Sequence, residues 1–540
     1  MPADARSRAL MNANVLTPVA GSAAELRRAE AVLTGDGAIA WVGSEHEVRE
    51  RAPAGTEFVD LRGRTVVPGF VDAHIHPIFY GLSLEGVPCL PPHVTSIADL
   101  RRGIEERALS TKTDDWIWGQ GYDDTRLVEG RHPTRDDLDA PAGGRPVVLT
   151  RVCGHMCVAN SRALELAGID ATTPDPPGGR IERDAAGEPT GLLLETAESL
   201  VLRHVSHDRE HVLRALRRVS DDLIRHGITA CCDAWLGYSE GAAEPDIWTE
   251  ALASGAFRPG ISFLVHHELW RQRPDLPETA LDVLGVKVVA DGSVSGGSAG
   301  LTDPFLDDED HRLFVFDPEE LNELCADIGS RGLVAAIHAM GDRAITMALD
   351  AVEVSHDRGV AHTSARPGYR IEHCSLPSPS DIDRMARLGV TPVMQPIFLF
   401  AEGEAYLERL GTERSVWANP ARAMIDAGVR VALGSDAPAT TWGEPTDVML
   451  GIQTSVTRLT WAGSSLGIAQ STTVAEALIG YTANAASAAG FGGDRGMLEA
   501  GRRADLAVLS EDPLRAPIEG IRDVEVVATI LAGELAFGEL

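Results

Sequence analysis

The stretch Thr65-Val-Val-Pro-Gly-Phe-Val-Asp-Ala-His-Ile-His76 decides the fold prediction, because an apolar run with strand character leads directly into two histidines. β-Branched and aromatic residues favour a buried strand over residues 65–71. In extended backbone, residues two apart point to the same face, so His74 and His76 can reach one ion. Two histidines at this spacing also occur by chance as hydrogen-bonded surface groups, and the pair alone therefore predicts no site.

Seven further apolar runs follow along the chain, and each leads into polar or ionisable residues. Helical stretches separate many of them, which is typical of an alternating β/α architecture. Eight such strands predict an α/β fold built on a (β/α)8 TIM barrel, whose active site forms at the carboxyl ends of the strands. The seven runs are 227–232, 261–265, 285–290, 333–337, 369–372, 390–394 and 429–433.

The spacing of these runs also predicts the domain organisation. The gap after the first run is very long, so we expect residues from about 80 to 225 to form an inserted subdomain that roofs the barrel mouth. Both ends of the chain are β-rich, but neither is long enough for a core of its own. Residues 1–65 and 491–540 are therefore expected to pair into one small β-sandwich domain, with the barrel spanning 66–490.

Composition excludes several classes of partner. Acidic residues outnumber basic ones 80 to 48, giving a formal net charge of -32. This charge repels phosphate backbones and anionic lipid surfaces, which argues against nucleic acid and membranes as partners. The start of the chain has no apolar signal region, so we expect a cytoplasmic protein with reduced, mostly packed cysteines. We expect a small-molecule substrate, and the sequence leaves open whether the protein forms a homo-oligomer.

Four more potential metal ligands stand on the later strands in barrel order. Lys287 lies within the fourth run, His338 follows the fifth, His373 follows the sixth and Asp436 follows the eighth. Because the ends of different barrel strands converge on one axis, residues distant in sequence become neighbours in space. Nitrogen and oxygen donors of this mixture suit zinc or a similar divalent ion. Together with these four residues, the His74/His76 pair predicts a metal site.

Two members of this set invite specific roles. An ammonium cannot bind a cation, so Lys287 is either structural, paired to an acid such as Asp291, or carboxylated into an anionic ligand that bridges two metals. Asp436 is the first choice for general base, accepting a proton from metal-activated water. The competing interpretation of Asp436 is a strand-end residue that caps the next turn.

Other polar residues near the strand ends have more ordinary interpretations. Asp342 precedes a helical stretch and is predicted to be an N-cap. Asp72 either orients a ligand histidine or makes a simple strand-end hydrogen bond. His266 and His267 follow the third run and could touch substrate, but nothing in the sequence raises them above ordinary polar residues.

The residues quoted above, with their neighbours, resemble the amidohydrolase superfamily, and in particular its amidohydrolase-3 branch of YtcJ-like and N-substituted formamide deformylase-like proteins. The resemblance covers nearly the whole chain. In the barrel it rests on Val67–His76, Ala290-Asp-Gly-Ser293, Ile337–Asp342, Ile371-Glu-His373 and Gly434–Pro438; elsewhere it rests on Arg151–His155, Asn160-Ser161, Gly187–Glu195 and Arg495–Leu509.

What the resemblance implies is a deformed barrel, one or two divalent metals, and hydrolysis of an amide or another non-peptide C–N bond by metal-activated water. It implies metal ligation by His74, His76, His338 and His373, the bridging position for Lys287, and the catalytic position for Asp436. His155 and Glu195 match the inserted region and would contact substrate or metal, or be ordinary structural groups. A deaminase, an ester or lactone hydrolase, and a non-catalytic barrel scaffold are the alternatives.

Overall fold

A computed structural model describes most of the chain. The described residues are 7–112, 115–124, 126–152, 156–176, 179–205, 207–306, 312–359 and 368–540. They form two compact units. The first contains Met1–His76, Ser220–Ala437 and Thr446–Leu540; the second contains Pro77–Val219 and Pro438–Pro445.

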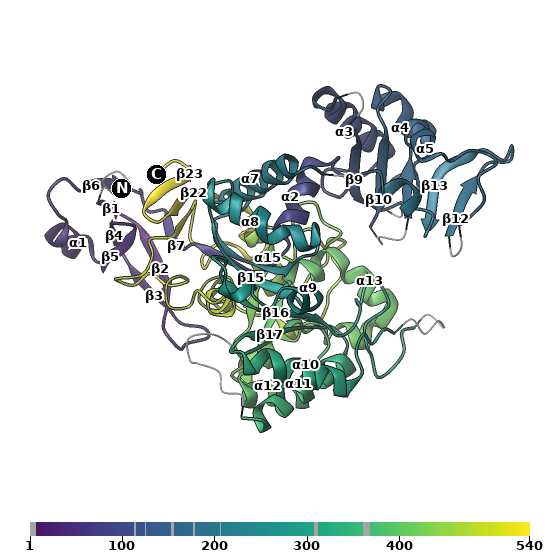
Figure 1. The fold of residues 1–540 in the computed structure, drawn as a ribbon. Helices are drawn as coiled ribbons and strands as arrows, with labels where there is room; N and C mark the ends of the chain where they lie inside the picture. Colours follow the sequence, from purple (N-terminus) through teal and green to yellow (C-terminus); the bar gives the residue numbers. More distant parts are fainter. Residues whose placement is uncertain are drawn as a thin grey trace. The chain divides into compact units, whose positions relative to one another are not determined.

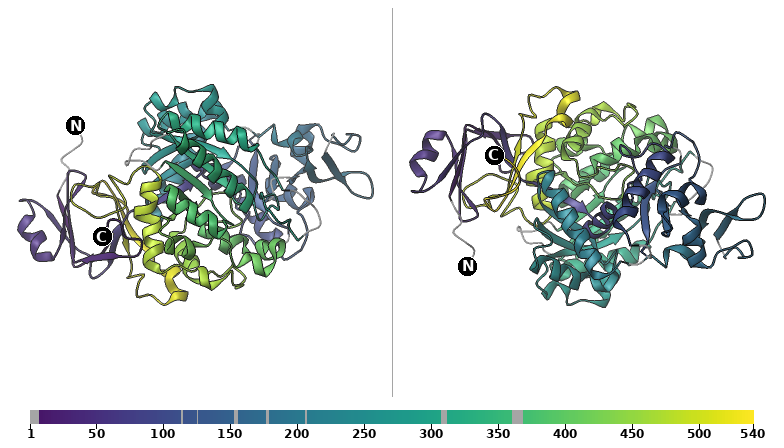
Figure 2. Two further views of the ribbon diagram at one scale, coloured as in Figure 1. Left: turned by 90° about the horizontal axis from the view of Figure 1, so that it is seen from below. Right: turned by 90° about the horizontal axis from the view of Figure 1, so that it is seen from above.

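Eight parallel strands form the central sheet of the first unit, in the order β20-β19-β18-β17-β16-β15-β14-β8. Their helices lie around the outside of the strands, as in α10 (Pro318–Ser330), α11 (Asp342–Asp357) and α12 (Pro379–Leu388), which pack side by side (Figures 1 and 2). The (β/α)8 prediction is confirmed. The strands are β8 (Phe70–Ile75), β14 (Ile228–Leu236), β15 (Gly260–His266), β16 (Val283–Val289), β17 (Val334–Ala339), β18 (Tyr369–His373), β19 (Thr391–Met394) and β20 (Ala432–Leu433).

The barrel closes through the segment that follows its short last strand. The Asp436 backbone N–H donates to the His74 carbonyl at 2.7 Å, and the His76 N–H donates to the Ala437 carbonyl at 3.0 Å. The Ser435 N–H donates to the Asp72 carboxylate at 3.0 Å. These bonds place the residues after β20 against the carboxyl end of β8, because each satisfies a backbone group that would otherwise be orphaned at the seam.

The first predicted strand is divided between two sheets. Residues Thr65–Pro68 form β7, which pairs with β2 (Asn14–Pro18) and β21 (Leu506–Leu509) in a terminal sheet, and the barrel strand begins only at Phe70. Gly69 lies at the junction, where a side chain would collide with Thr229 at 2.2 Å. The chain crosses there from one sheet to the other, a few residues later than the predicted boundary at 65/66.

Strands from both ends of the chain build two terminal sheets. A six-stranded sheet has the order β23-β22-β21-β7-β2-β3, and a four-stranded sheet has the order β5-β4-β1-β6. Leu10 from one sheet and Val66 and Leu506 from the other lie in one hydrophobic cluster. The remaining strands are β1 (Arg8–Met11), β3 (Leu26–Ala29), β4 (Ala31–Gly35), β5 (Ala38–Gly43), β6 (Glu57–Asp60), β22 (Val526–Leu531) and β23 (Glu534–Gly538).

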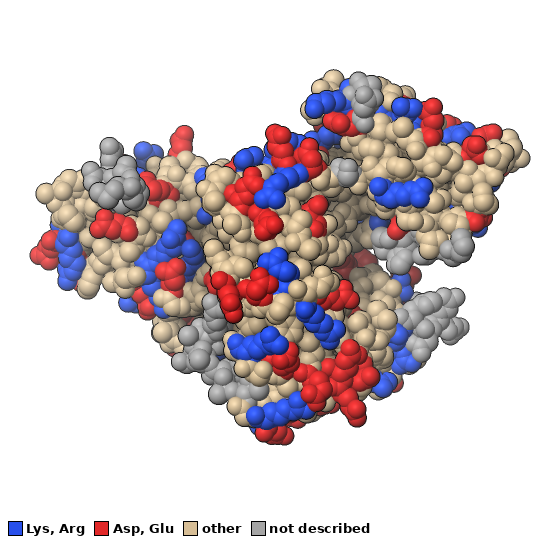
Figure 3. Space-filling model, viewed as in Figure 1, with Lys and Arg blue, Asp and Glu red and all other residues tan. Residues whose placement is uncertain are grey.

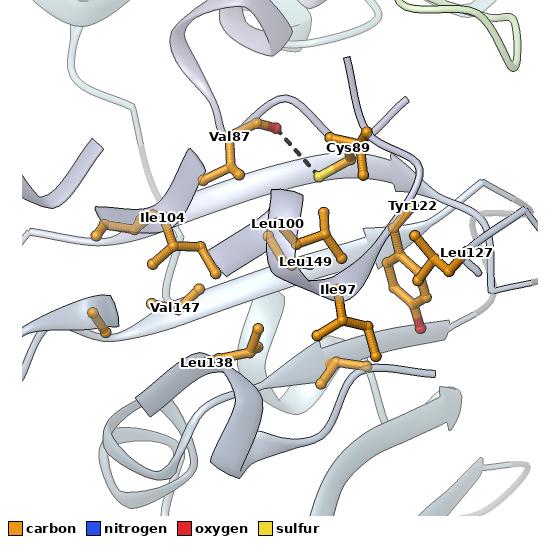
Figure 4. Packing of buried hydrophobic residues seen from close by; sticks show 14 of the residues in the cluster. Val87, Cys89, Ile97, Leu100, Ile104, Tyr122, Leu127, Leu138, Val147 and Leu149 are labelled. Atoms are coloured by element: carbon orange, nitrogen blue, oxygen red, sulfur yellow. Dashed lines mark hydrogen bonds between the residues drawn. The ribbon is translucent and has the colours of Figure 1, made fainter. Parts of the chain in front are cut away.

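The second unit has a core of its own. Its five-stranded sheet, in the order β12-β13-β11-β10-β9, is covered by helices that include α3 (Ile97–Ser110) and α4 (Arg135–Ala142). Figure 4 shows Leu100 and Ile104 of α3 facing Leu149 of the sheet, all fully buried. Its strands are β9 (Ile117–Tyr122), β10 (Val147–Arg151), β11 (Met156–Ala159), β12 (Gly179–Arg183) and β13 (Pro189–Glu195).

The surface carries the charge that the composition predicts. On the face shown in Figure 3, carboxylate groups lie in small clusters interspersed with lysine and arginine side chains. Among the described residues, no helix has both the length and the apolar character needed to cross a membrane.

Candidate metal centre

The two histidines of β8 point to one side of the strand, as their spacing predicts. His74 is fully buried, whereas the side chain of His76 is 12% exposed. Both turn the Nε2 atom toward the same carboxylate oxygen, Asp436 Oδ1, at 3.3 Å for His74 and 2.9 Å for His76. The first and last strands of the barrel therefore meet in one polar cluster.

Asp436 reaches this cluster through an uncommon backbone conformation. Its φ of +55° lies in the left-handed region, which few residues other than glycine adopt. Burial alone would raise the pKa of Asp436, but the adjacent His74 and His76 outweigh it and hold that pKa well below its usual range. The carboxylate is thus ionised and able to bind a cation or accept a proton.

His373 joins from the end of β18, where the backbone also turns. Neighbouring residues of a strand normally point to opposite faces, yet Glu372 and His373 both reach the cluster. His373 has φ +69°, which breaks the alternation. Its ring lies 4.9 Å from that of His74, and Gln395 Oε1 lies 2.8 Å from its Nδ1.

His338, on β17, stands at the edge of the same group. Its ring centroid is 4.4 Å from that of His373, and its Nε2 lies 3.1 Å from the Gly292 carbonyl. Burial, assisted by the charge of Lys287, lowers the pKa of His338 to about 3. The imidazole is therefore neutral at physiological pH, the form in which histidine binds metals.

The donor set fits a divalent cation. Ligand atoms of His74, His373 and Asp436 all lie within 4.8 Å of one another, and all three residues are buried. His76 adjoins this trio through Asp436, while His338 adjoins it through His373. Imidazoles combined with one carboxylate match the ligands of zinc and related ions.

Lys287 lies beside these donors on β16. Its Nζ is 3.5 Å from His74 Nε2, and burial lowers its pKa although the charges of Glu372 and Asp436 oppose the shift. Asp291, the acid considered as its partner, instead accepts backbone N–H groups from Gly300, Met340 and Gly341. The structure thus places Lys287 at the centre and leaves Asp291 to fix the loops after β16 and β17.

Sequence reasoning missed a buried charged pair beneath His74. Glu372 Oε2 lies 2.5 Å from His74 Nδ1, and Arg370 donates to both oxygens of Glu372 at 2.8 and 2.9 Å. Because a carboxylate can only accept, His74 Nδ1 directs a proton at Glu372, and this leaves Nε2 as the atom that would bind an ion in the cluster. The one available sequence signal was a pair of charged residues two apart inside the apolar run 369–372.

The remaining candidates have varied outcomes. Asp72 accepts the His74 N–H at 3.1 Å, and burial raises its pKa to about 6. The N-cap prediction for Asp342 is wrong: Gly341 is the N-cap of α11, and Asp342 instead accepts the Thr302 N–H at 2.9 Å. His155 and the side chain of Glu195 lie outside the described residues.

Comparisons with known proteins agree with this fold. Residues 57–537 match the amidohydrolase family, and the chain belongs to it. It is 32% identical to "Putative amidohydrolase YtcJ" of Bacillus subtilis, over 94% of this chain and 96% of that protein. It is 33% identical to the N-substituted formamide deformylase of Arthrobacter pascens, over 98% of both chains.

A solved structure extends the likeness to three dimensions. An uncharacterised metal-dependent hydrolase from Pyrococcus furiosus matches with a TM-score of 0.74 and 26% identity, over 94% of this chain and all of that one. Family membership and these neighbours support a metal-dependent hydrolase.

Proposed function

We propose that the protein hydrolyses a non-peptide C–N bond, of the amide or formamide type, at a zinc centre in the barrel. The observation that carries the proposal is the buried trio of His74, His373 and Asp436 at the carboxyl ends of three barrel strands. Full-length similarity to an N-substituted formamide deformylase supports the C–N bond class. His76 and His338 are proposed to complete the ligand set.

The reaction needs a proton acceptor beside the activated water. A divalent ion, when bound, supplies a Lewis acid that lowers the pKa of water and polarises a carbonyl group. Asp436, kept ionised by His74 and His76, accepts the water proton at a carboxylate oxygen. The same residue returns that proton to the nitrogen as the C–N bond breaks, so one amide and one water give an amine and a carboxylic acid.

Lys287 is proposed to be carboxylated and to bridge two ions. Its burial lowers the pKa, which increases the fraction of neutral amine able to react with carbon dioxide. Metal quantification and intact-protein mass measurement test this role together. A single tightly bound ion per chain, with no added carboxylate mass, would end the bridging hypothesis.

The experiment that tests the function is metal analysis of purified protein followed by assays with N-substituted formamides, N-acyl amines and cyclic amides. We expect stoichiometric divalent metal and release of an amine. Turnover of only amidines, esters or lactones would instead assign a deaminase or an ester or lactone hydrolase, since one site can attack many sp² carbons.

The outcome that overturns catalysis is equally specific. Protein without stoichiometric metal that hydrolyses nothing in this panel would be a barrel scaffold. A small-molecule substrate, a cytoplasmic location and the absence of nucleic-acid and membrane partners stay predictions from the sequence, and the assembly state stays open.

A further inference from the structure

Aromatic side chains stand beside the metal centre at the end of β14. The Trp235 ring lies 6.4 Å from the His76 ring, and the Tyr238 ring lies 5.9 Å from it, centroid to centroid. The two rings contact each other at 5.1 Å with an interplanar angle of 61°. Trp235 lies near the end of β14 and Tyr238 lies in the loop that follows this strand, so both border the centre on one side.

A third ring extends this surface from the next strand. His266, the last residue of β15, stacks on Trp235 at 4.7 Å with an interplanar angle of 18°. Burial lowers the pKa of His266 to about 4, so the ring is neutral at physiological pH. We call Trp235, Tyr238 and His266 the aromatic wall. Lys287 Nζ, 5.8 Å from the Trp235 ring centroid, ties the wall to the centre.

A buried glutamate holds the turn that carries part of the aromatic wall. Glu244, 2% exposed, accepts the backbone N–H groups of Gly237, Ser239 and Glu240, the last two at 2.5 and 2.8 Å. Gly237 has φ +104°, and a side chain there would collide with Leu269, so the turn needs glycine. One acid thus orders the turn that carries Tyr238.

A second buried acid fixes the strand end. Asp233, 3% exposed, accepts the Trp235 N–H at 3.1 Å. Burying carboxylates is costly unless their oxygens are satisfied. Two such buried acids order one short segment of chain, yet its aromatic side chains stay partly accessible, since Tyr238 is 50% exposed. A surface held this firmly and left accessible beside a reactive centre is suited to contact substrate.

We propose that Trp235 and Tyr238 are specificity-determining residues that select a planar, aromatic substituent on the substrate. Aromatic rings attract one another in offset-stacked or edge-to-face geometry, and a saturated ring of equal size lacks this attraction. The inference rests on the proposed C–N hydrolysis, and it adds the chemical class of the group attached to the scissile bond. Glu244 acts as a positioning residue through the turn.

The test compares two formamides that share one carbon skeleton, one with a planar aromatic ring and one with a saturated ring. N-(2-phenylethyl)formamide and N-(2-cyclohexylethyl)formamide have equal carbon skeletons and leaving amines of similar basicity. Wild-type kcat/KM should favour the phenyl compound by about twofold to tenfold, the factor that one aromatic contact provides. Trp235→Leu and Tyr238→Leu should each reduce this preference, and Glu244→Gln should do so through the turn, all with unchanged metal content.

Matched controls separate this effect from general damage. Trp41→Leu makes the same change in the terminal sheets, on β5, and should leave the preference unaltered. If Trp235→Leu fails to fold, Tyr238→Leu decides the question, because a half-exposed side chain contributes little to the core. Unchanged phenyl preference in both variants, or its absence from the wild type, overturns the proposal.

Calorimetric titration of the zinc-loaded protein distinguishes failure of the wall from failure of the proposed function. If neither formamide is hydrolysed, the proposed reaction fails for this class, but binding still reports on the wall. Tighter binding of the phenyl compound, lost in the Trp235 and Tyr238 variants, supports the aromatic wall. Equal binding, or undetectable binding of both compounds, contradicts it.

Discussion

Replacing Glu372 by Gln tests whether the buried pair beneath His74 prepares that histidine to bind metal. The amide keeps the shape of the side chain but removes its charge. One of the two terminal atoms of the amide is an NH2 group, which donates. In the carboxylate, by contrast, both atoms are acceptors, and one oxygen accepts from Arg370 and from His74 Nδ1 at once. If the NH2 group faces His74, Nδ1 must accept a hydrogen bond, so a neutral imidazole carries its proton on Nε2 and offers no lone pair there to an ion.

The magnitude follows from the burial of the three residues. Glu372, Arg370 and His74 are all fully buried. Burial would raise the pKa of Glu372, but Arg370 and His74 outweigh it and hold it well below its usual range. Removing one partner of such a pair costs about 3–5 kcal/mol of stability. Loss of a carboxylate behind a ligand histidine weakens metal binding by roughly 10- to 100-fold.

The assay measures two quantities on the same variant. Chelator competition gives the zinc Kd, and denaturant unfolding of the metal-free protein gives stability. Glu323→Gln is the matched control, because Glu323 also makes a two-fold contact with an arginine, Arg358, but at the exposed surface. That variant should lose no more than about 1 kcal/mol and keep its zinc affinity.

Two results would refute this reasoning. If Glu372→Gln loses stability while its zinc Kd stays at the wild-type value, the pair braces the barrel without preparing His74. If it loses no more stability than Glu323→Gln, the buried charge is not paired in the way the contacts indicate.

Three further predictions concern catalysis, metal and pH. Asp436→Asn should keep the fold and most of the metal while kcat falls by roughly 10²- to 10⁴-fold, and a metal-loaded, fully active variant would exclude Asp436 as the base. Chelation should lower the thermal unfolding midpoint of the wild type, with recovery on adding zinc, because the ion binds only the native state; His74→Ala combined with His373→Ala should abolish that response. Burial, reinforced by the charge of Glu240, raises the pKa of Glu244 to about 7, although backbone N–H groups oppose the shift. The folded protein therefore holds a proton that the unfolded chain releases near pH 4.5, and stability should fall as pH rises from about 4.5 to 7. Glu244→Gln should flatten that decline in denaturant unfolding, and an unchanged slope would assign it to other groups.

The strands of the barrel could be predicted because their signal is local. Runs such as 333–337 and 390–394 are apolar, short and bounded by polar residues, and each forms a strand close to its predicted place. The first run was the exception. Residues 65–71 carry one continuous strand signal, but strand propensity does not say which sheet a strand joins, and the change of sheet at Gly69 depends on Thr229 in another strand.

The candidate site, too, could be predicted only in part. The sequence by itself determined the residue types at the strand ends, so His74, His76, Lys287, His338, His373 and Asp436 could be proposed together. Only the tertiary structure decided which groups support them. Glu372 and His74 are 298 residues apart in the sequence and meet only in the folded chain. Glu244 looks like an ordinary surface glutamate in the sequence, and only the structure shows that it is buried and accepts the backbone N–H groups of a turn. Periodicity and propensity are properties of neighbouring residues, whereas burial and the pairing of buried charges depend on which distant segments the fold brings together.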